Sequence, residues 1–353
     1  MFLGEVIRRA VLLSVIFLVQ SSFSFAEFWS ENYESAVKGH DKKNEFVWEP
    51  KAKQPFSECI VSWNAKRPSK GKFVFSVSAC VGDEWSPYGK LAEWGAKEQK
   101  SFFNQLKAGS APIRVAHVRT VVDEGRMATD FRVKVEAEDG AKMSGLHKLF
   151  ATTTNDGIVP PIPKEGDFSD LATSVVKWYP RQSQMELRDH PRFAKLCSPV
   201  STWLLTQFHK FGKKVKDCIG FPHEDVTKFA EAVHDTGTLD IYGNWLFNVA
   251  EAHNVLGKKK NCRVTRLKDF GEMYNLIKKQ KPVVVSIRGP IPGGITDYAG
   301  GHLLSVIGFS KEHQRVICID PGFRPSKKTL HGYQLLDFLK AWRRSRHLTY
   351  LFS

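Results

Sequence analysis

Cys197 is the residue of this sequence that could most readily act as a nucleophile. It opens the run Cys197-Ser198-Pro199-Val200-Ser201, after which apolar residues follow at helical spacing up to Gly212. Proline lacks an amide hydrogen and fits the first turn of a helix. The pattern therefore predicts a helix over 198–211 that begins at the thiol, where unpaired amides and the helix dipole favour thiolate. A small buried residue at a helix start has the same pattern, so a nucleophile also needs a base and an orienting group.

An imidazole and a carboxylate lie at the ends of two predicted neighbouring strands. Gly300-Gly301-His302 precedes an apolar run at 303–309, and a second apolar run ends at Asp320-Pro321-Gly322. A hairpin centred on residue 311 or 312 places His302 opposite residue 320, 321 or 322, with Asp320 within one position of direct pairing. Asp320 could then orient His302 and leave its other ring nitrogen for Cys197. Each residue alone fits an ordinary turn, but together they indicate a Cys-His-Asp triad.

The elements that position these residues are expected within 171–353, where helices come first and strands later. This order predicts an α+β domain. Apolar periodicity predicts helices at 198–211, 225–235, 244–256, 268–280 and 333–345. Strands are expected near 263–267, 282–288, 302–309, 314–319 and 348–352.

The preceding part of the chain has a different pattern, with short alternating runs from about 56 to 151. Alternation broken by Gly, Pro, Asp and Ser predicts an all-β sandwich. Residues 27–55 are polar and charged and are expected to be a poorly ordered lead-in, and 152–170 has the composition of a linker. Three tryptophans in the sandwich are expected in its core, with a sugar-binding platform as the alternative; they are Trp63, Trp85 and Trp94.

The first residues have the features of a secretory signal. Arg8 and Arg9 precede a short apolar run, and Ser24-Phe25-Ala26 offers small residues for cleavage, which predicts a mature chain starting near Glu27. The apolar run is too short to span a membrane, and we expect a protein exported to the periplasm, cell surface or medium. The 353 residues carry a formal net charge of +15. Such a basic exported protein favours an anionic cell-envelope polymer as partner rather than nucleic acid.

Five further cysteines accompany Cys197, and an exported chain could bridge some of them; they are Cys59, Cys80, Cys218, Cys262 and Cys318. None has the paired spacing of a zinc site, and no metal or organic cofactor is implied. Cys59 and Cys80 lie on two strand-like runs joined by a turn at 68–71. A hairpin there would place them opposite each other, either as a disulfide or as two free thiols.

Residues 180–353 resemble the papain-like cysteine peptidases related to the bacteriocin-leader-processing peptidases (cysteine peptidase family 39-like), in particular their stand-alone exported branch. The resemblance is spread in order over the domain; its motifs are Ser183-Gln184-Met185, Cys197-Ser198-Pro199-Val200-Ser201, Gly243-Asn244-Trp245, Pro282-Val283-Val284-Val285-Ser286, Gly301-His302-Leu303-Leu304, Asp320-Pro321 and Ala341-Trp342.

The resemblance implies a papain-like fold and a role for each matching residue. Cys197 matches the nucleophile, His302 the general base and acid, and Asp320 the orienting residue. Gln184 matches the glutamine whose amide donates to the oxyanion, with Gln182 as a nearby rival. Two departures, Val200 for threonine and Leu196 for tryptophan, are expected to affect pocket shape rather than catalysis.

These observations predict an exported cysteine peptidase that cleaves peptide or protein substrates through an acyl-thioester. A non-catalytic envelope- or glycan-binding protein on a peptidase-like scaffold is one alternative. A second alternative keeps the thiol chemistry and changes the substrate to a peptidoglycan amide.

Overall fold

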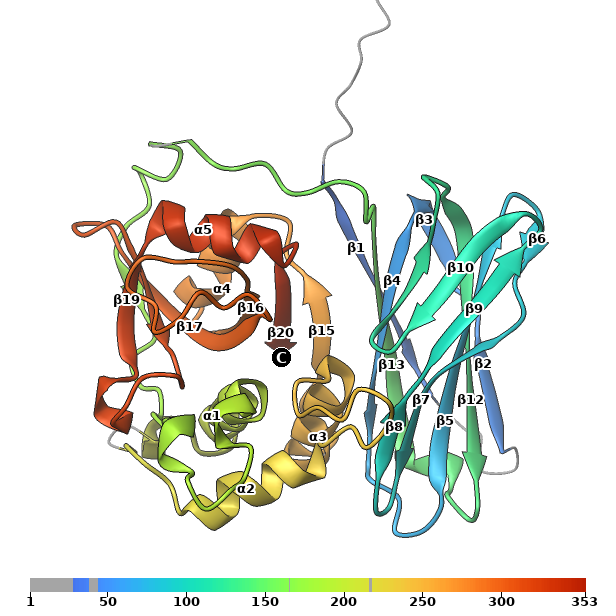
Figure 1. Ribbon diagram of the computed structural model, residues 1–353, viewed down its shortest axis with the longest axis horizontal. Helices are drawn as coiled ribbons and strands as arrows, with labels where there is room; N and C mark the ends of the chain where they lie inside the picture. The colour runs from blue at the N-terminus through green and yellow to red at the C-terminus, as the bar shows by residue number, and fades with distance from the viewer. Residues whose placement is uncertain (1–27, 38–43, 165, 216–217) are drawn as a thin grey trace, which may run out of the picture.

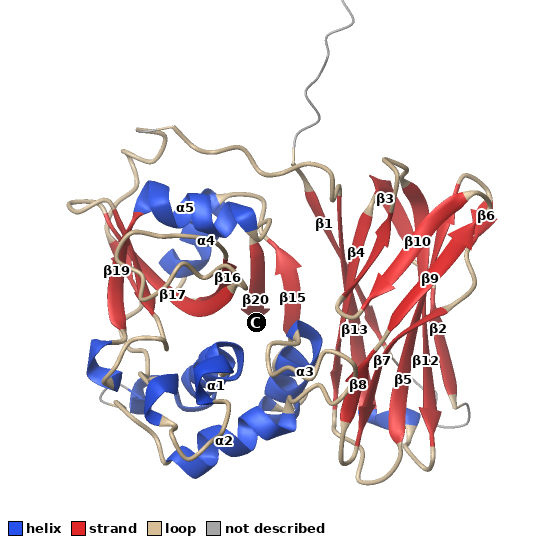
Figure 2. Cartoon of the chain, in the orientation of Figure 1, coloured by secondary structure: helices blue, strands red, loops and turns tan. Residues whose placement is uncertain are grey.

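The computed structural model describes residues 28–37, 44–164, 166–215 and 218–353. They form two regions that lie side by side, the first built from strands and the second from helices and strands (Figures 1 and 2). The expected signal segment, 1–26, lies outside the described residues. Within those described ranges, no helix is both long and apolar enough to cross a membrane.

The first region consists of two antiparallel sheets that lie against each other (Figure 1), with an apolar core between them. One sheet has, in spatial order, the strands β1 (Ser30–Ala36), β13 (Leu146–Thr154), β4 (Glu58–Ala65), β11 (Arg119–Val122), β10 (Ala111–Ala116) and β9 (Phe103–Ala108). The other has the order β2 (Glu45–Trp48), β12 (Ala128–Glu138), β5 (Lys72–Val81), β7 (Gly89–Gly95) and β8 (Gln99–Ser101), with β3 (Lys51–Phe56) on β12 and β6 (Glu84–Trp85) on β5. A short 3-10 helix spans Met143–Gly145.

Aromatic residues from both sheets fill the space between them. Trp63 of β4 stacks on Phe75 of β5 with ring centroids 3.8 Å apart, and Trp94 of β7 is fully buried. Trp85 instead lies at the surface, under the Arg132 guanidinium. Two of the three tryptophans are therefore core residues, and the three do not share one exposed platform.

Two expectations for this region are wrong. The described residues 28–37 and 44–55 are not a poorly ordered lead-in, because they contain β1, β2 and most of β3, which pair with β13 and β12. Strand β13 also continues to Thr154, into the expected linker. Cys59 and Cys80 do not face each other, because β4 and β5 belong to different sheets. Their pattern suggested a hairpin, but the chain crosses between the sheets at 68–71, and all six cysteines are free thiols.

The second region has a seven-stranded antiparallel sheet with helices on its faces. Its spatial order is β15 (Cys262–Arg266), β20 (Leu348–Phe352), β16 (Val283–Ile287), β17 (His302–Ser310), β18 (Arg315–Ile319) and β19 (Leu330–Gln334), with β14 (Ser174–Val175) on β17. The helices are α1 (Cys197–Phe211), α2 (His223–Ala232), α3 (Trp245–Leu256), α4 (Phe270–Lys278) and α5 (Leu335–Arg344). Short 3-10 helices span Gln184–Glu186, Phe193–Lys195, Gly212–Val215 and Ser326–Lys328.

Each of the five helices lies within three residues of its predicted bounds, and the five predicted strands are present. Helix α3 starts where Asn244 caps it, with its side-chain oxygen accepting from the Leu246 amide at 3.1 Å. The strands β14 and β19 were not predicted. They are short runs whose polar residues and glycine interrupt an alternating pattern.

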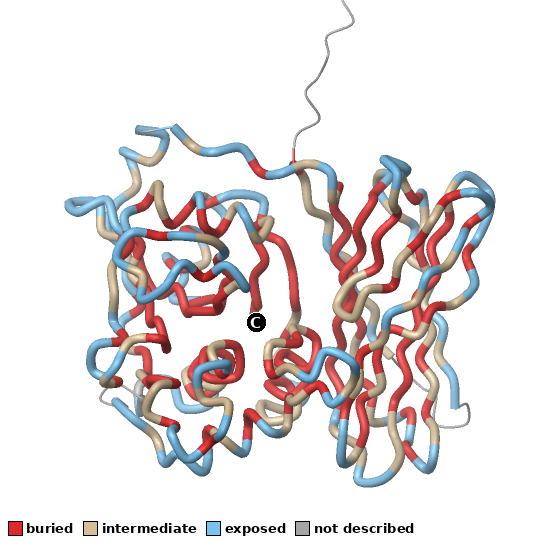
Figure 3. The backbone as a smooth tube through the Cα atoms, viewed as in Figure 1, coloured by how far each residue is buried: buried red, intermediate tan, exposed pale blue. Residues whose placement is uncertain are grey.

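The two regions meet along the edge strand β15, which side chains of β4 cover. Asn64 donates to the Cys262 carbonyl at 2.6 Å and accepts from its amide at 3.1 Å, and Ser62 accepts from the Val264 amide at 3.3 Å. Every residue of β4 is buried, and buried residues line both sides of this boundary (Figure 3). These side chains satisfy backbone groups that an exposed edge strand would leave unpaired.

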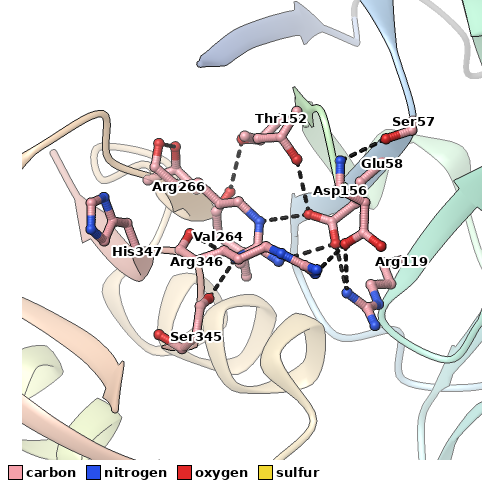
Figure 4. A network of polar contacts seen from close by, with 12 residues as sticks. Ser57, Glu58, Arg119, Thr152, Asp156, Val264, Arg266, Ser345, Arg346 and His347 are labelled. Carbon is pink, nitrogen blue, oxygen red and sulfur yellow. Dashed lines mark hydrogen bonds and ion pairs between the residues drawn. The ribbon is translucent and has the colours of Figure 1, made fainter. Parts of the chain in front are cut away.

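A buried ion pair continues the same contact. Glu58 of β4 accepts two hydrogen bonds from the Arg266 guanidinium, at 2.5 and 3.1 Å, and both side chains are almost fully buried (Figure 4). Arg119 also bonds to Glu58 at 2.7 Å, and Asp156 bonds to both Arg119 and Arg346. Burial alone would raise the pKa of Glu58, but Arg266 and Arg119 lower it to about 2.

We expect Glu58→Gln to lower the free energy of unfolding by about 3 kcal/mol at pH 7, because it leaves Arg266 buried without a counter-charge. Glu31→Gln is the matched control, since Glu31 pairs with Lys53 at the surface, and should cost at most about 1 kcal/mol. The folded-state pKa of Glu58 is depressed, so its stabilisation is present above about pH 5 and is lost as the pH falls towards 2. Urea unfolding at several pH values measures both effects. Equal stability of the two variants at pH 7 would contradict this account.

Candidate active site

Cys197 is the first residue of α1, as the sequence predicts, and the helix is fixed directly to the strand that carries His302. Ser201, one turn into α1, donates to the Leu303 carbonyl at 3.0 Å, and Ser198 bonds to the Tyr350 hydroxyl of β20 at 3.1 Å. Both serines are fully buried. Two polar contacts therefore hold the amino-terminal end of α1 against the sheet.

The structure brings His302 and Asp320 together. His302 begins β17, and its Nε2 lies 2.7 Å from the Asp320 Oδ1. The strand register shifts near Ile307, and at this end of the hairpin Ser305 pairs with Ile319. Continuing that register sets His302 opposite Gly322, within the predicted range.

The expectation that Asp320 lies within one position of direct pairing with His302 is wrong. In the same register Asp320 lies opposite Leu304, two positions away. Because side chains two positions apart share one face of a sheet, this diagonal arrangement still allows the two side chains to meet.

The Asp320 carboxylate is fully buried and receives four hydrogen bonds. Its Oδ1 accepts from His302 and from the Gly322 amide at 2.8 Å, and its Oδ2 accepts from the hydroxyls of Tyr298 at 3.1 Å and Tyr333 at 2.6 Å. The Tyr298 ring also stacks on His302, with centroids 4.4 Å apart. Burial raises the pKa of Asp320, but His302, Tyr333 and Gly322 lower it below its ordinary value.

The Cys197 thiol and the His302 imidazole line the same cleft, and each changes the pKa of the other. Burial raises the pKa of Cys197, but His302 and the Leu303 amide outweigh it and lower this pKa below its ordinary value. Burial lowers the pKa of His302, but Asp320 and Cys197 outweigh it and raise this pKa to about 10. These opposite directions favour a thiolate–imidazolium pair. Because Nε2 faces Asp320, Nδ1 is the nitrogen left for the thiol.

Gln184 lines the same cleft as Cys197 and His302. Its backbone amide donates to the Pro321 carbonyl at 2.9 Å, which ties it to the residue after Asp320. Its side-chain amide donates one hydrogen to the Ala194 carbonyl at 2.7 Å. The second hydrogen of this amide has no acceptor among the described residues. The rival Gln182 is fully buried, accepts from the Phe221 amide at 2.6 Å and does not line the cleft.

The cleft has a volume of about 1000 Å³ and lies between the two regions. Helix α1 and the start of β17 contribute one part, and the turn between β10 and β11 contributes residues 116–119. The two departures from the family pattern, Leu196 and Val200, are fully buried and do not line it. Neither side chain touches the cleft, so the structure gives no direct support to the expectation that they affect pocket shape.

The sequence did not indicate that Tyr298 and Tyr333 bind Asp320. It also did not indicate that the first region forms one wall of the cleft. Tyr333 lies on the unpredicted strand β19, and Tyr298 lies in a loop with no periodic pattern. Nothing near either residue in the sequence indicates a contact with Asp320. These contacts follow only from the three-dimensional arrangement of the sheet.

Tyr333→Phe should lower the free energy of unfolding by about 2 kcal/mol, because it removes one donor from a buried carboxylate. Tyr33→Phe is the control, since the Tyr33 hydroxyl accepts a hydrogen bond from the Lys53 amide at the exposed edge of the first region, and should change stability by less than about 0.5 kcal/mol. Chemical unfolding followed by tryptophan fluorescence measures both. A Tyr333 variant as stable as the Tyr33 variant would contradict the role given to this hydrogen bond.

Comparison with known protein families gives a match over the second region. Residues 176–350 match the sequence profile of the Peptidase_C39 like family. A solved crystal structure of a Bacillus anthracis protein described as a C39-like peptidase is also similar, with 14% sequence identity over 51% of this chain and 98% of that one, at a TM-score of 0.35. No curated protein matches the sequence. The second region, residues 176–350, belongs to the Peptidase_C39 like family of papain-type peptidases.

Proposed function

We propose that this protein is a cysteine peptidase in which Cys197 attacks the carbonyl carbon of a peptide bond. The observation that carries the proposal is the meeting of three groups at the cleft. Cys197 and His302 both line it and shift each other's pKa, and the buried Asp320 carboxylate bonds to His302 at 2.7 Å. A cysteine beside an imidazole that a third group orients is the arrangement of activated thiol nucleophiles. Membership of the family adds support, because a peptidase acts on peptide or protein substrates.

In the first half of the reaction, the Cys197 thiolate forms a bond to the carbonyl carbon, and the carbonyl oxygen becomes an oxyanion. The amide of Cys197 lies in the first turn of α1, where helix amides have no intrahelical acceptor. This amide and the remaining amide hydrogen of Gln184 would donate to the oxyanion. The His302 imidazolium then gives its proton to the leaving amine, the carbon–nitrogen bond breaks, and an acyl-thioester stays on Cys197.

In the second half, neutral His302 takes a proton from water as the water oxygen attacks the thioester carbon. The carbon–sulfur bond breaks, the carboxylic acid product leaves, and the thiolate–imidazolium pair forms again. Asp320 holds His302 in one orientation through both halves and balances its charge. Tyr298 and Tyr333 keep Asp320 in place.

Cys197→Ala and His302→Ala should each lower kcat/KM at least about 1000-fold, because either change removes the nucleophile–base pair. Asp320→Asn should cost less, about 10- to 100-fold, since an amide can still accept a hydrogen bond from His302. Peptide hydrolysis and labelling by an electrophilic thiol probe measure these changes.

The control for this series is Cys218→Ala, because Cys218 is a partly exposed thiol outside the cleft. It should keep full hydrolysis and full labelling by the probe. Equal labelling of the wild-type protein and the Cys197 variant would contradict the proposal.

A further inference from the structure

Two arginines on the rim of the cleft have exposed guanidinium groups, and among the described residues neither has a carboxylate partner. Arg288 follows β16, and Arg344 is the last residue of α5; both side chains line the cleft. The geometry points to a binding site for an acidic segment of the peptide substrate, with its carboxylate against these two guanidinium groups. This inference rests on the proposed peptidase function and adds the chemical class of the substrate.

Backbone contacts hold both arginines in place. Arg344 Nη1 donates to the carbonyls of Arg288 at 3.3 Å and Pro290 at 3.1 Å. Gly289 lies beneath it with a φ of +75°, and a Cβ there would come within 3.0 Å of Nη1. Arg288 Nε donates to the Ala299 carbonyl at 3.1 Å. Each guanidinium is therefore held through one nitrogen, and the other N–H groups stay available for a ligand.

Other arginines of the cleft have carboxylate partners close by. Glu58 and Asp156 bind Arg119, Arg266 and Arg346 in the buried network of Figure 4. Arg288 and Arg344 differ from these three arginines, because neither forms an ion pair among the described residues.

The remaining charges of the cleft leave a positive excess. Lys195, on the side of Cys197, is also exposed and has no acidic partner in the described parts of the chain. Asp240 lines the cleft, and its carboxylate pairs with Arg192. Asp297 also lines the cleft, and its carboxylate accepts a hydrogen bond within its own loop. A cleft with three such cations and one such carboxylate attracts negative charge.

The position of the two arginines sets which substrate residues they could reach. Ile287 pairs directly with His302 across β16 and β17, and Arg288 is the next residue. Neighbouring strands lie about 4.8 Å apart, and an extended peptide advances about 3.3 Å per residue. An acidic residue roughly two to four positions from the scissile bond would therefore meet them. Arginine is well suited to this contact because its planar fork binds a carboxylate through two parallel hydrogen bonds.

The test uses pairs of peptides that differ only by Glu or Gln at positions two to four from the cleaved bond, found first by mass spectrometry of a digested peptide library. For each protein the readout is the ratio of kcat/KM for the Glu peptide to that for the Gln peptide. The variants are Arg288→Gln, Arg344→Gln and the double variant, with Arg344→Lys to keep the charge. Lys259→Gln is the matched control, since Lys259 is exposed and does not line the cleft.

We expect the wild-type protein to prefer the Glu peptide about tenfold or more, and this preference to weaken as salt increases. The double variant should lose the preference, Arg344→Lys should keep part of it, and Lys259→Gln should keep all of it. Arg288→Gln alone should weaken it, and this single variant leaves the Arg344 contacts to the loop intact.

A protein that cleaves both peptides equally, or whose preference survives in the double variant, would overturn the inference and leave the peptidase function standing. If no peptide in the library is cleaved and the thiol probe does not label Cys197, the proposed function fails and this inference fails with it. Labelling by the probe therefore separates the two failures.

Discussion

The buried carboxylate of Asp320 is the constraint on which the geometry of the site depends. A carboxylate with no solvent contact is stable only when its oxygens are hydrogen-bonded and its charge is balanced. Here the donors are His302, the Gly322 amide and two tyrosine hydroxyls, and they come from β17, β19 and two loops. The hydrogen bond to Asp320 fixes the orientation of the His302 ring. The hydrogen bond from Ser201 to the Leu303 carbonyl holds α1, which begins at Cys197, against the same strand. The Cys197 thiol is thus positioned by interactions that also stabilise the sheet.

The contact between the two regions has a second effect, because it completes the cleft. Asn64 and Ser62 cover the edge of β15, and Glu58 neutralises Arg266 at the end of that strand. Arg119, which also bonds to Glu58, begins β11 directly after the turn that forms one wall of the cleft. A change at this buried network would therefore alter both the stability of the interface and the shape of the cleft.

The sequence was informative where local pattern determines structure. The start of α1 at Cys197 followed from helix-start residues, and the meeting of His302 with Asp320 followed from a hairpin with a short turn. Gln184 was found through the family resemblance alone, because a single glutamine in a loop has no local signal.

The remaining features depend on contacts between distant residues. The polar strands β1 to β3 are held by pairing with β12 and β13, in pairs 72 to 124 residues apart. The hairpin expected for Cys59 and Cys80 failed because chain proximity does not show whether two strands share a sheet or cross between sheets. Tyr298 and Tyr333 belong to the same class, since the sheet brings them to Asp320 without any sequence pattern.

The central claim is that an acyl group is transferred to Cys197 during peptide cleavage, and acid quenching of the reaction within its first turnover tests it most directly. Intact-mass measurement should show a species heavier by the amino-terminal part of the substrate, and proteolytic mapping should locate the added mass on the peptide that contains Cys197. Hydroxylamine should remove it, as it does thioesters. Peptide hydrolysis that proceeds at the full rate in Cys197→Ala, or an adduct located on another residue, would contradict the account.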